Sequence, residues 1–281
     1  MKLTVKNHNR DAANLRYVYP VVSRRAGGVS VGINLNPNNA CNFRCVYCQV
    51  PNLVAGKGPE IDLKRLEQEL RGLLDDVVRG DFMQRRVPEA ARRLSDVAFS
   101  GNGEPTSSPQ FVESIEQVAA CLRDYGLLHQ IPMVLITNGS LADKPRVREG
   151  VERLAQVGGQ VWFKLDSATE QGTWEINQYR TPIATRIERL VQTARTCPTW
   201  VQTCWFLRDG AVPSDEECSA YLRLMHELVE RDVPLAGVLL YGLARPSMQP
   251  EAPRLAALPP ERLEAFAERI RSIGLAVRVA P

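Results

Sequence analysis

The sequence predicts an α/β fold in which six or so parallel strands alternate with helices and form a partial (β/α)6, TIM-like barrel with a short N-terminal extension. Three observations predict this fold. Short β-rich runs alternate with amphipathic stretches along the chain. The 281 residues are 44% hydrophobic and 24% charged, as in ordinary globular proteins. Polar residues or glycines follow each candidate strand, where barrels of this type carry their functional groups.

The candidate strands are short runs rich in β-branched and aromatic residues. They are separated by stretches long enough to contain a crossover helix, which predicts a parallel sheet. The predicted strands comprise residues 29–35, 96–100, 133–137, 161–166, 200–207 and 236–241.

The helices are predicted from apolar periodicity and from their end signals. Leucine and valine recur at helical spacing across residues 63–77. A later helix begins at Ser214, where Glu217 three residues on completes a capping-box pattern. A last helix is predicted over residues 260–273, followed by a final short strand over residues 275–279.

Six polar motifs follow the six predicted strands in chain order. Because the carboxyl ends of parallel strands meet at one rim, these motifs are predicted to form a single site. The motifs read NPNNACNFRCVYCQ, SGNGEPTS, TNGS, KLDS, QTC and YGLARPS.

The predicted organisation has three parts: a basic extension over residues 1–28, a core barrel over residues 29–246, and a helix and strand over residues 247–281 that pack on the core. The net charge of +3 is too small to indicate nucleic acid. Two basic clusters are interpreted as solvated faces. The first comprises Lys2, Lys6, Arg10, Arg16, Arg24 and Arg25, and the second, an arginine cluster, comprises Arg85, Arg86, Arg92 and Arg93. No apolar run is long enough to span a bilayer, and the N-terminus lacks a secretory pattern. We therefore expect a cytoplasmic protein without membrane contact.

Three of the seven cysteines, Cys41, Cys45 and Cys48, lie within eight residues with the spacing C-x3-C-x2-C. An odd, clustered set of cysteines favours metal chemistry over a disulfide framework. Three thiolates on one short loop can ligate three irons of a [4Fe–4S] cube, and the fourth iron then stays open for chemistry.

Two other interpretations of this loop exist. A zinc ion could use the same thiolates with a distant fourth ligand such as His8 or Cys121, although zinc motifs usually pair two C-x2-C elements. The trio could also be structural. No role is assigned to the histidines or to the scattered cysteines, which are Cys121, Cys197, Cys204 and Cys218.

The loop CNFRCVYC, in which Tyr47 precedes the last cysteine, resembles the signature of the radical S-adenosylmethionine (radical SAM) superfamily. The resemblance implies a [4Fe–4S] cluster whose open iron chelates the amino and carboxylate groups of S-adenosylmethionine. An electron, supplied by a reductant such as flavodoxin or ferredoxin, then breaks the sulfur–C5′ bond. The resulting 5′-deoxyadenosyl radical abstracts hydrogen from a substrate. The resemblance also implies a cofactor contact for Tyr47.

Two further motifs resemble the cofactor-binding motifs of this superfamily. In SGNGEP, Gly103 lets the backbone approach a ligand and Glu104 offers a carboxylate to the ammonium group of the cofactor. In TNG, Asn138 occupies the position of a cofactor-binding asparagine. Asn-Gly is also an ordinary turn signal.

The remaining candidates are assigned from strand alternation. Lys164 and Asp166 share one face of a strand and are interpreted either as an interior ion pair or as cofactor ligands, with Ser167 as a ribose contact by position. Gln202 and Arg245 are candidate substrate contacts, since arginine recognises carboxylate or phosphate with two hydrogen bonds.

Taken together, CNFRCVYCQV, SGNGEPT, TNG, KLD and YGLARP are most similar to the radical SAM enzymes grouped with wyosine-type tRNA-modifying proteins and uncharacterised iron–sulfur oxidoreductases. Wyosine-forming enzymes carry a second cluster on N-terminal cysteines, and no cysteine precedes Cys41, which argues against that reaction. We predict a single-cluster enzyme acting on an unidentified small molecule. The alternatives are modification of a tRNA or other RNA base, and a non-catalytic electron carrier or iron sensor.

Overall fold

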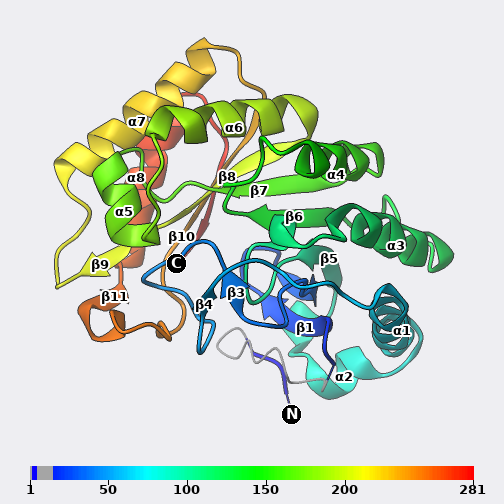
Figure 1. Cartoon of the computed structure of the whole chain (residues 1–281). Coiled ribbons are helices and arrows are strands. Elements are labelled where there is room, and N and C mark those ends of the chain that lie inside the picture. Colours follow the sequence, from blue (N-terminus) through cyan, green and yellow to red (C-terminus); the bar gives the residue numbers. More distant parts are fainter. Residues whose placement is uncertain (1, 5–14) are drawn as a thin grey trace.

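A computed structural model describes residues 2–4 and 15–281 of the chain. An eight-stranded sheet has the strand order β1-β2-β5-β6-β7-β8-β10-β12 and curls into an open half-barrel (Figure 1). All its neighbouring strands run parallel except β1 and β2, which are antiparallel. The strands are β1 (Val18–Ser23), β2 (Gly28–Ile33), β5 (Leu94–Phe99), β6 (Met133–Thr137), β7 (Gln160–Lys164), β8 (Thr199–Cys204), β10 (Leu235–Tyr241) and β12 (Val277–Ala280).

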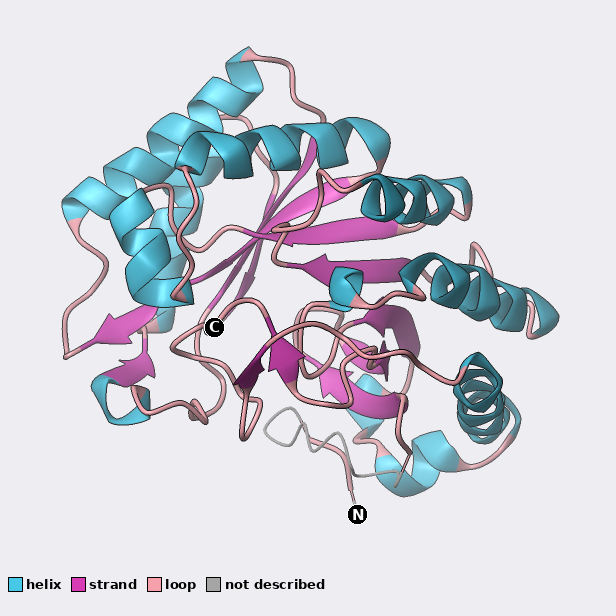
Figure 2. Cartoon of the chain, viewed as in Figure 1, coloured by secondary structure: helices cyan, strands magenta, loops and turns pink. Residues whose placement is uncertain are grey.

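Helices cover the outer face of the curled sheet (Figure 2). Two small pairings lie outside the sheet: β3 (Ala40–Cys41) with β4 (Val54–Ala55), and β9 (Phe206–Arg208) with β11 (Leu255–Ala257). The helices are α1 (Leu63–Leu74), α2 (Phe82–Arg86), α3 (Phe111–Asp124), α4 (Pro145–Gln156), α5 (Glu170–Asn177), α6 (Ile183–Thr196), α7 (Asp215–Glu230) and α8 (Pro260–Arg271).

The predicted fold class is confirmed, and each predicted strand corresponds to one in the sheet. The prediction for residues 200–207 joined two strands that are separate. Trp205 lies between β8 and β9, and its ring stacks on Phe266 of α8 at a centroid distance of 3.7 Å. The chain therefore leaves the main sheet after Cys204 and pairs with β11 instead.

The N-terminal segment takes part in the sheet. β1 pairs along its whole length with β2, so residues 18–23 form an edge strand rather than an appendage. The turn between these strands carries Arg24 and Arg25, and Arg24 Nη2 donates a hydrogen bond to the carbonyl of Gly242, just beyond β10, at 3.3 Å. The hairpin therefore reaches across the concave side of the sheet. Lys6, His8 and Arg10 lie outside the described residues.

The helix predictions are largely confirmed. α1 ends at Leu74, and the chain continues as a π-helical turn that buries Val77. Ser214 caps α7 by accepting from the backbone N–H of Glu217. The Glu217 carboxylate, however, accepts from the hydroxyls of Ser167 and Thr169, which lie beyond β7. This tertiary contact replaces the reciprocal half of the predicted capping box.

Apolar side chains fill both faces of the sheet. The large core lies between the strands and the outer helices, and a second cluster fills part of the concave side. Burying each large aliphatic side chain stabilises the fold by about 1.5–3 kcal/mol. None of the helices in the described part of the chain is long and apolar enough to cross a membrane. The second cluster comprises Ala98, Val134, Trp162, Trp200 and Leu239.

Candidate active site

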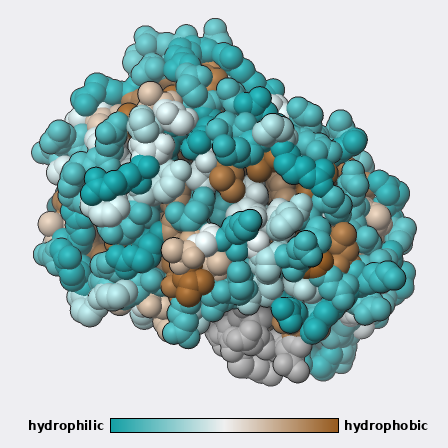
Figure 3. All heavy atoms as spheres, viewed as in Figure 1, coloured by the Kyte–Doolittle hydropathy of each residue, from teal (hydrophilic) through white to brown (hydrophobic). Residues whose placement is uncertain are grey.

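A pocket opens on the concave side of the sheet and receives residues from every predicted polar motif. The face shown in Figure 3 is mostly hydrophilic, with small separate hydrophobic patches. Of the residues predicted to form the site, all but two line the pocket. Asp166 and Ser167 do not. The predicted residues in its wall are Cys41, Cys45, Tyr47, Cys48, Gly103, Glu104, Asn138, Lys164, Gln202 and Arg245.

The three clustered cysteines form one part of this wall, and each of these residues is only partly buried. The other four cysteines are buried. Cys121 is fully buried in α3 and does not line the pocket, so it cannot complete a zinc site with the loop. Across residues 2–4 and 15–281, no group of three or more His, Cys, Asp or Glu side chains is arranged to hold a single metal ion. Three thiols that each ligate a different iron of a cube need no such convergence.

Burial keeps the thiols of Cys41 and Cys45 neutral in the absence of a metal. It raises the pKa of Cys41 and of Cys45 to about 12, and the Glu104 carboxylate contributes to the rise at Cys41. A thiol must lose its proton to ligate iron, so cluster binding at these residues would release protons.

The end of α5 supports the cysteine loop. The backbone N–H groups of Arg44 and Val46 donate to the carbonyls of Asn177 and Ile176 at 3.1 and 2.8 Å. Asn177 Nδ2 also donates to Cys45 Sγ at 3.4 Å and to Asp166 Oδ2 at 2.7 Å. A single amide group thereby connects Cys45 to the buried carboxylate of Asp166.

A C-terminal segment holds the loop from the other side, and we call Ser247, Met248 and Gln249 the loop clamp. The Ser247 hydroxyl donates to the carbonyl of Val46 at 2.7 Å, and the Met248 N–H donates to that of Cys48 at 2.8 Å. Gln249 Nε2 donates to the carbonyl of Val50 at 3.0 Å. These bonds satisfy carbonyls of a loop that has little regular structure of its own.

The glycine motif after β5 packs directly against the cysteine loop. A Cβ atom at Gly103 would overlap the carbonyl oxygen of Ala40, and one at Gly101, whose φ is +153°, would overlap Asn34. Positions 101 and 103 are therefore glycines for a steric reason: the glycine motif and the segment that leads into the cysteine loop lie too close together for a side chain at either position.

Glu104 is buried and its carboxylate is held by four donors. Oε1 accepts from both the hydroxyl and the N–H of Thr106 and from the hydroxyl of Thr137. Among the residues that the structure describes, Oε2 accepts only from the Asn138 N–H, at 2.7 Å. Burial raises the pKa of Glu104 even though these donors oppose the rise. Since a carboxylate oxygen has two lone-pair sites, Oε2 retains capacity for one further donor.

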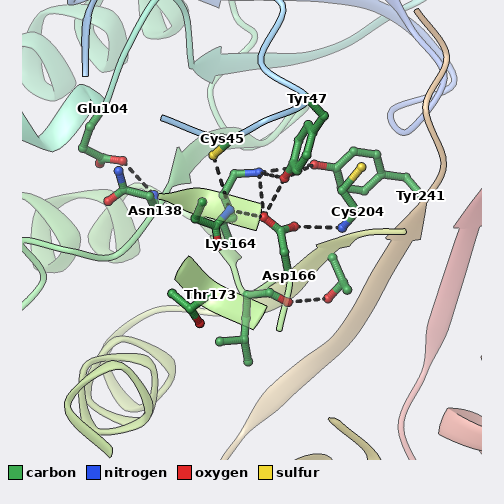
Figure 4. Close-up of polar contacts among 12 residues, drawn as sticks. Cys45, Tyr47, Glu104, Asn138, Lys164, Asp166, Thr173, Cys204 and Tyr241 are labelled. Atoms are coloured by element: carbon green, nitrogen blue, oxygen red, sulfur yellow. Dashed lines mark hydrogen bonds and ion pairs between the residues drawn. The ribbon is translucent and has the colours of Figure 1, made fainter. Parts of the chain in front are cut away.

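Asn138 ties the third motif to the first. Its Nδ2 donates to Asn42 Oδ1 at 2.8 Å, and its Oδ1 accepts from the Ser140 N–H at 2.9 Å. Asn42 in turn donates to the Ser140 hydroxyl at 2.6 Å. The amide is thus engaged in fixing the cysteine loop, and Figure 4 shows the Asn138–Glu104 contact beside the network around Asp166.

Lys164 and Asp166 form an interior ion pair, with 3.6 Å between Nζ and Oδ2. The Tyr47 hydroxyl donates to Asp166 Oδ2 at 2.6 Å and lies in hydrogen-bond contact with Lys164 Nζ (Figure 4). The Cys204 N–H donates to Asp166 Oδ1 at 2.9 Å. Burial opposes the charge of Lys164, yet Asp166 and other neighbouring groups hold its pKa well above the ordinary value. Asp166 is therefore buried behind this wall and holds Lys164, Tyr47 and the Cys204 backbone in position.

A family comparison decides the identity of this arrangement. Residues 35–201, which contain the cysteine loop, the glycine motif and β5 to β7, match the model of the radical SAM superfamily. The chain belongs to the radical SAM superfamily. It is an enzyme, and membership implies S-adenosylmethionine and an iron–sulfur cluster as cofactors and the general radical reaction of the family. The interpretation as a non-catalytic carrier or sensor is therefore wrong.

Relatives of known sequence carry the name UPF0026 protein. One from Helicobacter pylori is 28% identical over 156 residues, or 55% of this chain and 44% of the relative. Another, from Methanocaldococcus jannaschii, is 31% identical over 160 residues, or 57% of this chain and 43% of the relative. The match spans less than half the length of these curated relatives.

Solved radical SAM structures share the fold. A structure described as TYW1 with a lysine–pyruvate adduct bound has a TM-score of 0.52 and 15% identity, covering 88% of this chain and 74% of its own. Streptococcus suis SuiB bound to S-adenosylmethionine has a TM-score of 0.54 and 14% identity, covering 89% and 45%. The likeness includes wyosine-type relatives, as the motifs predicted.

Several residues at the site of this radical SAM protein were not anticipated from the sequence. Tyr241 ends β10, and its ring faces the pocket beside Lys164. Because it is the last residue of a predicted strand, the sequence could have indicated its place at the rim. Arg24 and Arg25, interpreted as solvated, line the pocket. Asn177 and the loop clamp gave no local signal, because their partners lie 132 to 201 residues away in sequence. The Ser167 hydroxyl, predicted to contact ribose, instead donates to the Glu217 carboxylate and accepts from the Thr169 N–H.

Proposed function

We propose that Cys41, Cys45 and Cys48 hold a [4Fe–4S] cluster with one open iron, and that the enzyme reductively cleaves S-adenosylmethionine there. Bound in this place, the cluster would supply one electron that splits the sulfur–C5′ bond into methionine and a 5′-deoxyadenosyl radical, which takes a hydrogen atom from the substrate. The observation that carries the proposal is the placement of three partly buried cysteines and Glu104 in one pocket wall.

The surrounding residues are suited to separate tasks in this reaction. Oε2 of Glu104, with its remaining acceptor capacity, would receive the ammonium group of S-adenosylmethionine. Asn138 and Tyr47 keep the cysteine loop in place through Asn42 and Asp166. Gly103 keeps the same wall tightly packed. Gln202 and Arg245 line the pocket and are candidate substrate contacts by position. We also propose flavodoxin or ferredoxin as the electron donor and the cytoplasm as the location.

A small-molecule substrate is favoured over RNA by the contacts of the second arginine cluster. Arg85 pairs with Asp76 and Asp81, and Arg93 donates to the carbonyls of Ala26 and Gly27. These guanidinium groups are used within the molecule, where they brace loops. They are therefore a weak basis for a phosphate-tracking surface.

The test is anaerobic reconstitution with iron and sulfide, followed by reduction with dithionite in the presence of S-adenosylmethionine. The purified chain should bind about four irons and produce 5′-deoxyadenosine, and Cys45→Ala should do neither. Cys218→Ala is the matched control, because this thiol lies on α7 away from the pocket. Equal iron content and equal product in the wild type and in Cys45→Ala would refute the proposal.

A further inference from the structure

The inner part of the pocket lies on the concave face of the sheet and carries three side chains with N–H donors. We call Arg25, Trp162 and Gln202 the donor triad. Trp162 belongs to β7 and Gln202 to β8, and both face the pocket. Trp162 pairs in register with Trp200, two residues before Gln202, so the two side chains project from the same face.

Two members of the triad are buried and unpartnered. Trp162 and Gln202 are 4% and 1% exposed, and neither Trp162 Nε1 nor Gln202 Nε2 has a hydrogen-bond partner among the described residues. A buried donor without an acceptor is costly, and native structures rarely keep one that serves no purpose. Both orphaned atoms are donors. The group that satisfies them must therefore be an acceptor.

The third member brings positive charge to the same place. The Arg25 guanidinium carbon lies 5.4 Å from the Trp162 ring centroid and 4.9 Å from that of Tyr241, in cation–π contact with both. No carboxylate of the described residues lies within salt-bridge distance of it. The aromatic faces fix the guanidinium group and leave its N–H fork available.

Asp96 is the acidic side chain in this part of the pocket. Its carboxyl group accepts a hydrogen bond from the Ser30 hydroxyl, and burial holds its pKa at about 6 in spite of the field of Arg25. Arg24, beside Arg25, adds a second positive charge and is held by the Gly242 carbonyl. The inner pocket is therefore net positive even when Asp96 is ionised.

We propose that the donor triad binds an oxyanion, the carboxylate or phosphate group of a small-molecule substrate. Two neutral N–H donors and a guanidinium fork match the several lone pairs of such a group, and a neutral or cationic ligand would leave the arginine uncompensated. The cysteine loop lines the same pocket, so an anionic end on the triad would point the rest of the molecule toward the loop. The identification of the anion as a substrate rests on the proposed function; the anion site itself does not.

The test measures anion binding by the full-length, cluster-loaded protein. The probes are sodium phosphate and sodium acetate, each compared with sodium chloride at equal ionic strength, and the readouts are the melting temperature and the tryptophan fluorescence. We expect phosphate or acetate to raise the melting temperature above that in chloride. Arg25→Gln should weaken the binding about tenfold or more. Arg271→Gln, a change at a partly exposed arginine on α8 that does not line the pocket, should keep the wild-type response.

Two nearly isosteric variants separate recognition from stability. Trp162→Phe and Gln202→Met each remove an unpartnered donor and keep most of the packing. Each should weaken anion binding several-fold while the anion-free protein melts at the same or a higher temperature, because a buried unsatisfied donor is gone. A merely structural role would lower the melting temperature and leave anion binding unchanged, which would contradict the proposal.

The results of these experiments identify the class of anion and test the anion site separately from the proposed cleavage of S-adenosylmethionine. A response to phosphate alone assigns a phosphate ester, and a response to acetate alone assigns a carboxylate. Equal responses in the wild type and in Arg25→Gln, or none in either, would overturn the anion site. Cleavage of S-adenosylmethionine by the wild type is measured in parallel: cleavage without anion binding refutes only this inference, and anion binding without cleavage refutes only the proposed function.

Discussion

Asn177 Nδ2 lies 3.4 Å from Cys45 Sγ and 2.7 Å from Asp166 Oδ2, so both of its hydrogens are used to connect a proposed cluster ligand with a buried carboxylate. Hydrogen bonds to sulfur stabilise the more negative, reduced state of a cluster. Asn177→Leu should therefore lower the midpoint potential by ~40 mV, the one-electron equivalent of about 1 kcal/mol. Redox titration followed by electron paramagnetic resonance measures this shift. Gln171→Leu, an exposed change on the same helix, should leave the potential alone; an unshifted Asn177→Leu would contradict the assignment.

The Glu104 carboxylate is expected to bind the ammonium group of S-adenosylmethionine. In the wild type the Glu104 carboxylate accepts a hydrogen bond from the Asn138 N–H. Glu104→Gln removes the negative charge and places a neutral amide group at this position. A charge-assisted hydrogen bond contributes about 1.5–3 kcal/mol, so the dissociation constant for S-adenosylmethionine should rise roughly 10- to 100-fold. Equilibrium dialysis against the cluster-loaded protein measures it. Glu113→Gln, an exposed substitution on α3, serves as the control, and wild-type affinity in Glu104→Gln would exclude the contact.

The glycine motif offers a matched pair of alanine substitutions. Gly103→Ala places a methyl group against the Ala40 carbonyl and should displace the cysteine loop, lowering both the melting temperature and the iron content per chain. Gly72→Ala lies in α1 with open space around the new methyl group, and should raise the stability by about 0.5–1 kcal/mol. Calorimetry and iron analysis of both variants decide the matter. Full iron loading in Gly103→Ala would show that the loops can separate without consequence.

The loop clamp is predicted to hold the cysteine loop through its side-chain donors. Gln249→Leu leaves the buried Val50 carbonyl without its donor, which costs about 1–3 kcal/mol and should lower the iron content reached on reconstitution. Met248 contributes through its backbone and its side chain is exposed, so Met248→Ala should retain wild-type iron content. Equal iron content in the two variants would show that the Gln249 side chain does not hold the cysteine loop in place.

Asp96 predicts a dependence of stability on pH. Its folded-state pKa of about 6 lies above the value of an unfolded aspartate, so the folded protein holds the proton more tightly. The free energy of unfolding should therefore fall as the pH rises from about 4 to about 7, by about 3 kcal/mol from this group. Urea unfolding of the wild type and of Asp96→Asn at several pH values isolates the effect, since the variant lacks the titration. A constant difference between the two proteins across this range would contradict the raised pKa.

Local sequence signals predicted the scaffold and the superfamily well. Strand alternation and helical periodicity depend on residues within one or two turns of each other, and the main-sheet strands other than β1 emerged from them close to their observed bounds. The cysteine spacing and the glycine motif are also local. The pairing of Lys164 with Asp166 was one of two interpretations, and their ion pair in the structure favours the interior one.

Contacts between segments that are distant in sequence could not be predicted from these local signals. Arg25 reads as one of several basic residues near the N-terminus, and only the curl of the sheet carries it over Trp162 and Tyr241. Glu217 fits a capping box, but its carboxylate is drawn to Ser167 by the packing of α7. In both cases a side chain has several possible partners in the sequence, and the fold selects one.

The sequence by itself determined the superfamily, the parallel α/β architecture and the three cysteines, because these depend on spacing and on short-range periodicity. The tertiary structure alone decided what surrounds those cysteines: Asn177 on Cys45, the loop clamp on the Cys48 carbonyl, and the donor triad on the inner pocket wall. The physical reason is that hydrogen bonds and burial depend on distance in space, and these groups come from segments that only the curled sheet brings together.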